Sequence, residues 1–341
     1  SDVYKRQILI LLGLGYWAGG NPILLDMSWD KLVPDMSNFN NLVLAASIFL
    51  FYAGMEMSAV HVKDVNNPGR NYPLAILISA IITVLIFVLG TLAIGFIIPN
   101  SQINLVQSLL ITYDSYFSFF GLGWMNWILA LALAVGVLAQ VTAWVGGPSK
   151  GLYQVGLAGN LPPVMQKRNK NNVQMGILLI QGGIVTLLSI MFVIMPSVQS
   201  AYQIISQLTI ILYLIMYMLM FASGIYLRYR EPNTPRTFRI PGGRTFGMWV
   251  VGGLGLLASL AAFLVSFIPP NQITVGSSTM YVLLLVVGTF IFAGIPFIIH
   301  AMAKPSWKRP VDPEDAFEPF GWEKSNGSHS AATPSHSISH E

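Results

Sequence analysis

The sequence predicts an all-α integral membrane protein, and three observations support that prediction. Of the 341 residues, 54% are hydrophobic and only 9% are charged, whereas a soluble domain usually carries about 25% charged residues. Seven apolar runs are long enough to span a bilayer. Nearly all the basic residues fall in alternate connections between these runs. A soluble core has no use for so much apolar surface, so lipid is the expected solvent.

Each of the seven runs satisfies the length of a spanning helix, about 20 apolar residues. They cover residues 41–62, 71–98, 122–146, 173–195, 203–228, 247–269 and 279–303. They lack the alternation of a membrane strand, so helices are expected. An eighth run, Ile8 to Ala18, is shorter and indicates the second half of a helix. Ser1 to Arg6 look foreign to a membrane domain and are interpreted as a sequence artefact, which leaves 7–304 as the transmembrane domain.

The distribution of Lys and Arg predicts the orientation. One set of alternate connections holds 17 of the 18 basic residues, and the other set holds only Lys31. Cytoplasmic loops retain positive charge. We therefore expect both ends of the chain, including the C-terminus, to face the cytoplasm.

The connections differ in character. Residues 99–121 are rich in aromatic side chains and predict a helix lying on the outer surface, in one belt with Trp29, Trp124 and Trp127. The inner connection 147–171 opens around Gly146-Gly147-Pro148 and predicts a short cytoplasmic helix over 152–157, ended by Leu161-Pro162-Pro163. Residues 229–246 predict a loop. Residues 305–341 are polar and predict a cytoplasmic tail that is disordered unless it docks.

Glu56 is the most informative single residue, because a carboxylate within an apolar run costs at least about 2.5 kcal/mol on insertion scales. The preceding Ala53-Gly54 pair predicts an interruption of the helix, and interrupted helices expose backbone groups that bind substrates. In the alternative interpretation, Glu56 lies near the helix end and reaches the interface, or pairs with a neighbouring helix.

Two further pairs lie four residues apart and therefore on one helix face each. Tyr213 and Tyr217 continue a polar stripe from Ser206 and Thr209. Their hydroxyls could donate to a substrate carboxylate, or simply hold two helices together. Gln140 and Trp144 could line a cavity, or serve helix packing and interfacial anchoring.

The tail contains His329, His336 and His340, which gain charge below about pH 6.5 and could release a docked tail on acidification. An inert tail is the alternative. The chain has no Cys, and it shows neither a zinc-binding His-Glu-x-x-His motif nor a phosphate-binding Gly-Lys-Ser/Thr loop. No enzyme activity, metal, cofactor or nucleic-acid partner is therefore expected.

Several runs resemble those of the amino acid–polyamine–organocation transporters and, within that superfamily, of the bacterial glutamate/GABA antiporters. They are Phe51-Tyr52-Ala53-Gly54-Met55-Glu56, His61-Val62-Lys63-Asp64-Val65, Thr142-Ala143-Trp144-Val145, Ser206-Gln207-Leu208-Thr209, Tyr226-Leu227-Arg228-Tyr229-Arg230 and Ile240-Pro241-Gly242-Gly243. The resemblance extends from about residue 20 to 310.

The resemblance implies a LeuT-like fold, of which this chain would be half of helix five and helices six to twelve. Gly54 and Glu56 would lie at the break in helix six, Trp144 on helix eight, and Tyr213 and Tyr217 at the gating face of helix ten. Gln140 stands where the family places an acid, a departure that bears on substrate and pH response. The tail is similar to a C-terminal plug that leaves the cytoplasmic path under acid.

The function implied is acid-stimulated exchange of external glutamate for internal GABA across a bacterial inner membrane, contributing to acid resistance beside a glutamate decarboxylase. One alternative is an exchanger of the same fold with another substrate pair, such as glutamine, motivated by Gln140. A second is a membrane sensor that binds an amino acid without transporting it.

Overall fold

The computed structural model describes residues 2–26, 54–99, 107–234, 238–242, 245–270 and 277–309, together with the single positions 28, 35, 37, 41, 45, 103 and 236. Throughout these residues the regular structure is helical. The main helices are α1 (Asp2–Ala18), α4 (Pro68–Ile97), α5 (Ser108–Phe119), α6 (Asn126–Val155), α7 (Met175–Ser189), α8 (Met191–Ile194), α9 (Val198–Arg230), α10 (Phe246–Met248), α11 (Leu254–Val265) and α12 (Ser278–Ala301).

Short helices of other types connect them. They are η2 (Met55–Asp64), η4 (Gly123–Met125), η5 (Gly156–Asn160), η6 (Pro163–Gln166), η7 (Trp249–Gly253) and η8 (Pro305–Trp307). Two of these, η5 and η7, are π-helical turns that join longer helices, so α6 continues into η5 and α10 continues through η7 into α11.

Six helical segments within the described residues are long and apolar enough to cross a membrane. They match six of the seven expected spans, and half of the seventh, 41–62, lies outside the described residues. Only 0% to 28% of the most hydrophobic window of each segment is buried inside the chain. These side chains therefore face outward, as they do in lipid, where apolar surface needs no burial against protein. The chain is a multi-pass membrane protein.

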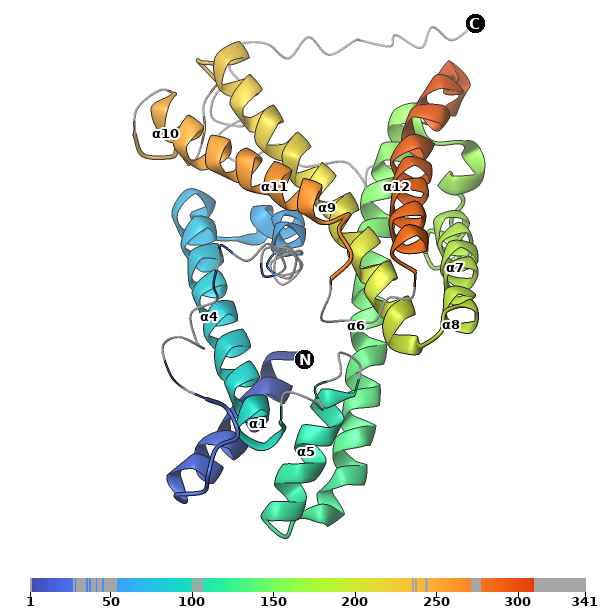
Figure 1. The fold of residues 1–341 in the computed structure, drawn as a ribbon. Helices are drawn as coiled ribbons and strands as arrows, with labels where there is room; N and C mark the ends of the chain where they lie inside the picture. Colours follow the sequence, from blue (N-terminus) through green and yellow to red (C-terminus); the bar gives the residue numbers. More distant parts are fainter. Residues whose placement is uncertain are drawn as a thin grey trace, which may run out of the picture.

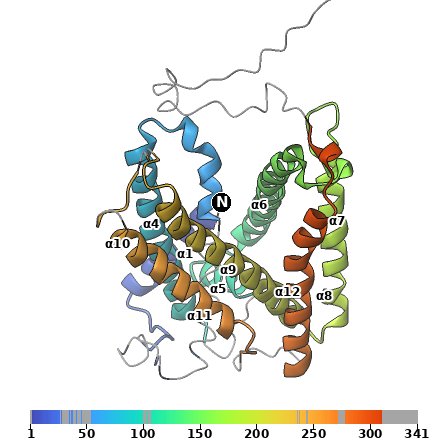
Figure 2. The same cartoon turned by 90° about the horizontal axis from the view of Figure 1, so that it is seen from above.

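Helix α9 connects the two sides of the molecule. It packs against α11 near one end and against α8 and α12 near the other. Both views show α1 and α4 on one side and α7, α8 and α12 on the other, with α9 crossing between them (Figures 1 and 2). A long helix in this position can bring a residue of its middle section to either half.

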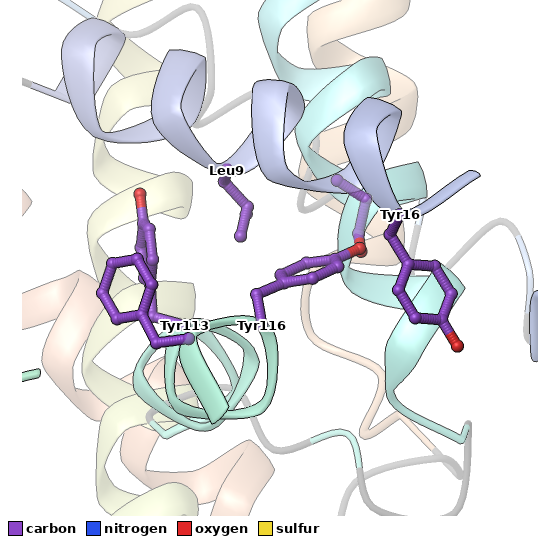
Figure 3. Close-up of a cluster of buried hydrophobic side chains, with 6 residues drawn as sticks. Leu9, Tyr16, Tyr113 and Tyr116 are labelled. Carbon is purple, nitrogen blue, oxygen red and sulfur yellow. The ribbon is translucent and has the colours of Figure 1, made fainter. Parts of the chain in front are cut away.

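The helix expected within 99–121 is present as α5, and Phe119 and Phe120 at its end are exposed, but its other aromatic residues are not. Tyr113, Tyr116 and Phe117 are buried, at 0%, 0% and 2% exposure, in a cluster with Leu9 and Tyr16 of α1. Figure 3 shows the rings of Tyr113 and Tyr116 rising from α5 toward α1. The interfacial prediction was wrong for these residues because α1 and α4 cover them, whereas Trp124 and Trp127 are exposed. Trp29 lies outside the described residues.

The helix predicted over 152–157 is present, and it ends before Leu161-Pro162-Pro163 as expected. It is not a separate short helix, because it continues the preceding span. Helix α6 runs through Gly146-Gly147-Pro148 without ending, and η5 carries it to Asn160. Proline removes one helix hydrogen bond, but membrane helices tolerate this because nearby hydroxyls and neighbouring helices compensate. The helix ends where Gly159 takes φ 93°.

Three other expectations concern the ends of the chain and the 229–246 connection. The first helix begins at Asp2, so it includes most of the six residues that the sequence sets apart. Between α9 and α10 the described residues form turns and irregular backbone, as expected for a loop. The tail residues 310–341, with His329, His336 and His340, lie outside the described residues.

Candidate functional site

At Gly54, the position where the sequence predicts an interruption, the backbone takes φ 98° and ψ −7°. This left-handed conformation is unfavourable for residues with a Cβ atom but open to glycine. A 3₁₀-helix of 10 residues, η2, follows directly. Runs of 3₁₀-helix beyond three or four residues are uncommon, and such a stretch often marks a functional hinge. The chain at Gly54 is therefore not a regular α-helix.

Glu56 folds back onto this interruption. The backbone N–H of Gly54 donates to both carboxylate oxygens, at 3.2 Å to Oε1 and 3.0 Å to Oε2. The Tyr217 hydroxyl of α9 donates to Oε2 at 3.0 Å. The carboxylate therefore joins the interrupted segment to a residue 161 positions later in the chain. Hydrogen bonds to a charged group are about twice as strong as neutral ones.

Trp144 of α6 packs against Gly54 and Tyr213. A Cβ atom at Gly54 would lie 2.8 Å from Trp144 Cη2 and 3.0 Å from Cζ2, so the indole rests directly on the glycine. The same indole meets the Tyr213 ring edge to face, with centroids 6.4 Å apart and planes at 82°. Tyr213 in turn lies beside Tyr217, at 5.9 Å between centroids. Glycine is required here for space as well as for backbone conformation.

Five of the six residues singled out for binding or gating thus meet at one place: Gly54, Glu56, Trp144, Tyr213 and Tyr217. They come from η2 with its N-cap, α6 and α9. Glu56 and both tyrosines are half-buried, and Trp144 is 41% exposed. A site that is lined by rings, holds one carboxylate and stays partly open has the composition of a small-molecule site.

The remaining predicted residues are not brought to this site by any described contact. Gln140 is exposed, one turn before Trp144 on α6. Thr209 is exposed, and its hydroxyl donates to the Ile205 carbonyl of its own helix at 2.9 Å. The polar stripe on α9 therefore reaches the site only through Tyr213 and Tyr217.

Sequence reasoning missed two features of the site. One is the pairing of Trp144 with Gly54, since nothing in the sequence relates positions 90 residues apart. The other is the hydrogen bond from the Gly54 N–H to Glu56. The two-residue spacing was a usable signal, because short polar side chains often bond the backbone nearby, but Glu is longer than the residues for which that pattern is usual.

Secondary transporters are helical bundles that span the bilayer and bind substrates where helical backbone becomes irregular, and here a carboxylate lies beside a left-handed glycine at the start of a 3₁₀-helix. Comparison with known proteins agrees. Residues 7–292 match the amino acid permease family, and the chain belongs to that family. The expected LeuT-like, all-α membrane fold is thereby confirmed, and the family is one of transporters rather than of enzymes.

Individual relatives narrow the comparison. The chain is 36% identical to an uncharacterized transporter of Legionella pneumophila, over 85% of the chain and 62% of that protein. It is 33% identical to a glutamate/gamma-aminobutyrate antiporter of Lactococcus lactis, over 88% of the chain and 60% of that protein. A probable agmatine/putrescine antiporter of L. lactis is 24% identical over 69% of the chain and 50% of its own length. The chain thus spans about three fifths of the length of the L. pneumophila transporter and of the glutamate/gamma-aminobutyrate antiporter.

Proposed function

We propose that the protein containing this chain is an amino-acid antiporter of a bacterial inner membrane, exchanging external glutamate for internal GABA by alternating access. The glutamate/gamma-aminobutyrate antiporters of L. lactis, at 33% identity, support this substrate pair. The amino acid permease family supports the transport class. In such folds, one bundle of helices rocks against another around a site near the middle of the bilayer.

One observation carries the proposal: the Glu56 carboxylate joins the break at Gly54 to Tyr217 on α9. Any movement of α9 relative to η2 acts on the hydrogen bond between Tyr217 and Glu56. This pair therefore couples the position of α9 to the geometry of the site. Two roles are open to Glu56, organising the break or meeting the substrate amine. The geometry favours the first, because both oxygens already accept the Gly54 N–H.

The aromatic residues take the remaining roles. Trp144 covers Gly54 and lines the route into the site, and Tyr213 links the indole to Tyr217. Release of the Tyr217 hydroxyl from Glu56 would free a donor for a substrate carboxylate. The tyrosine pair would thereby orient the substrate and gate its path.

Acid stimulation is assigned to the C-terminal tail. His329, His336 and His340 are neutral above about pH 6.5 and charged below it. A tail docked in its neutral form on the cytoplasmic side would leave as these residues gain charge. Decarboxylation of glutamate to GABA consumes a proton, so exchange beside a glutamate decarboxylase would contribute to acid resistance. Removal of 310–341 should then permit exchange at neutral pH.

A different substrate pair is the second candidate, and Gln140 favours it. This amide lies one turn from Trp144, at a position where the resemblance implies an acid. One protein similar to this chain is named a probable agmatine/putrescine antiporter, so its relatives are named for more than one substrate pair. A neutral amide beside the route would favour a neutral substrate such as glutamine.

Counterflow tests both candidates. The complete gene product that contains this chain is reconstituted into vesicles loaded with GABA, and uptake of labelled glutamate is measured at acidic and neutral pH. Uptake at acidic pH that requires internal GABA supports the proposal. Uptake driven only by glutamine, in a panel of competing amino acids, supports the second candidate. Binding of an amino acid without any flux through folded protein would refute both.

A further inference from the structure

The end of α9 lies at the boundary of the membrane. Its 33 residues extend about 50 Å at about 1.5 Å per residue, whereas the hydrocarbon core is about 30 Å thick. The last turns carry exposed aromatic residues, and the Trp249 indole N–H donates to the Tyr229 hydroxyl at 2.7 Å. Tyrosine and tryptophan favour the headgroup level of a bilayer. This end of α9 is therefore in reach of lipid headgroups.

A cavity of about 540 Å³ opens beside this end. Arg228 and Asn233 line it from the α9 side, and Arg239 with Ile240, Pro241 and Gly242 lines it from the following loop. Its lining is therefore cationic. Residues 228–244 hold five arginines and one acid, Glu231.

The walls of the cavity are fixed by the fold. Arg236 donates to the carbonyls of Leu227, Glu231 and Thr234, at 3.3, 2.8 and 3.2 Å, and so holds the loop against the end of α9. On the other wall, Gly242 has φ 108°, and its carbonyl accepts the Gly247 N–H at 3.3 Å. A Cβ atom at Gly247 would lie 1.9 Å from the Pro241 oxygen. Glycine alone permits this approach.

The arginines of this region have different tasks. Arg236 is engaged by three backbone carbonyls, and Arg230 donates to the Tyr226 hydroxyl. Arg239 is exposed and makes no hydrogen bond or ion pair with any described residue. It lines the same cavity as Arg228. Its planar guanidinium is suited to a bidentate contact with a phosphate.

We propose that this cavity binds the phosphate of an anionic phospholipid, with Arg239 as the principal contact and Arg228 as the second cation. Basic pockets beside membrane helices bind anionic headgroups in this way. The exposed Tyr226, Tyr229 and Trp249 favour a lipid over a dissolved phosphate, because they set the cavity at headgroup level. The inference does not depend on the transport site, since none of the site residues lines this cavity.

The test uses the complete gene product, purified in detergent, stripped of lipid and titrated with phosphatidylglycerol or phosphatidylcholine. Native mass spectrometry counts the lipids retained. Phosphatidylglycerol should bind at least about tenfold more tightly than phosphatidylcholine. Arg239→Gln should reduce that affinity about fivefold, which corresponds to about 1 kcal/mol per basic side chain near an anionic surface. Arg239→Lys, which keeps the charge, should lose less.

Arg70→Gln is the matched control, because Arg70 is also exposed but belongs to the first turn of α4, in another part of the chain. It should leave phosphatidylglycerol binding unchanged. Equal affinity for both lipids, or an equal loss in Arg70→Gln, would overturn the proposal. Displacement of phosphatidylglycerol by millimolar inorganic phosphate would overturn the lipid assignment in favour of a soluble anion.

Discussion

Two tyrosine pairs in this chain share a helix face each and yet serve different purposes. Tyr113 and Tyr116 of α5 are fully buried, and the Tyr116 hydroxyl donates to the Ala93 carbonyl at 2.6 Å. Tyr213 and Tyr217 of α9 are half-buried, and the Tyr217 hydroxyl donates to the Glu56 carboxylate. Spacings of three and four residues both place a pair on one helix face, so the partner of the hydroxyl is what distinguishes the pairs.

The difference lies in what each partner can do. A helix carbonyl is neutral and fixed, so the α5 pair stabilises one packing of α1, α4 and α5. Burial raises the pKa of Tyr113 to about 12, which keeps it neutral under ordinary conditions. A carboxylate on an interrupted segment carries charge and can exchange one donor for another. The α9 pair is therefore suited to the rearrangement that the proposed exchange requires.

Replacing Glu56 should give the largest effect, because it removes the feature that sets the two pairs apart. Glu56→Gln keeps the size but not the charge, and its amide N–H₂ would face the Gly54 N–H. With charged hydrogen bonds contributing about 1.5–3 kcal/mol each, exchange by the complete gene product should fall more than tenfold. Counterflow rates per folded protein, with folding checked by size-exclusion chromatography, measure this. Unchanged exchange would remove Glu56 from the mechanism.

The next largest effect is expected at Gly54, and the quantity that reports it is the stability of the folded protein. Gly54→Ala should destabilise the protein by about 1–2 kcal/mol for the left-handed backbone, with a further loss because the new methyl group meets Trp144. Thermal unfolding in detergent reports the sum.

Gly121→Ala is the control for backbone strain alone. Gly121 has φ 69°, and a Cβ atom there would meet nothing within 4 Å. Trp144→Leu in the Gly54→Ala background should recover part of the loss, since directly packed residues couple by about 0.5–3 kcal/mol. Equal destabilisation at positions 54 and 121 would show that Trp144 yields without cost.

These residues also show which features of the fold and of the site can be predicted from the sequence. Hydropathy predicts the helices, because length and apolar character suffice for a bilayer span. Glu56 and Gly54 were found because a carboxylate and a glycine stand out in an apolar run. The contact between Trp144 and Gly54 was out of reach, since it depends on how α6 packs. The same limit explains Tyr113 and Tyr116, whose burial depends on α1.

Removing single hydroxyls tests the comparison directly. Tyr217→Phe removes a hydrogen bond to a charged group, so it should lower stability by about 1.5–3 kcal/mol and should also lower exchange per folded molecule about tenfold. Tyr116→Phe should lower stability by about 1 kcal/mol while exchange per folded molecule stays the same. Measuring both quantities on both variants decides the matter. The distinction between the pairs fails if the two variants behave alike.

The smallest effect is expected at Tyr213, whose hydroxyl makes no hydrogen bond with any described residue but whose ring contacts Trp144 and Tyr217. Tyr213→Phe keeps the ring and should change exchange less than about twofold. Tyr213→Leu removes the ring and with it an edge-to-face contact of about 0.5–1.5 kcal/mol, so exchange should fall several-fold as Trp144 loses its support. A large loss in Tyr213→Phe would instead assign the hydroxyl to the substrate, and the stripe on α9 would then bind through both tyrosines rather than through Tyr217 alone.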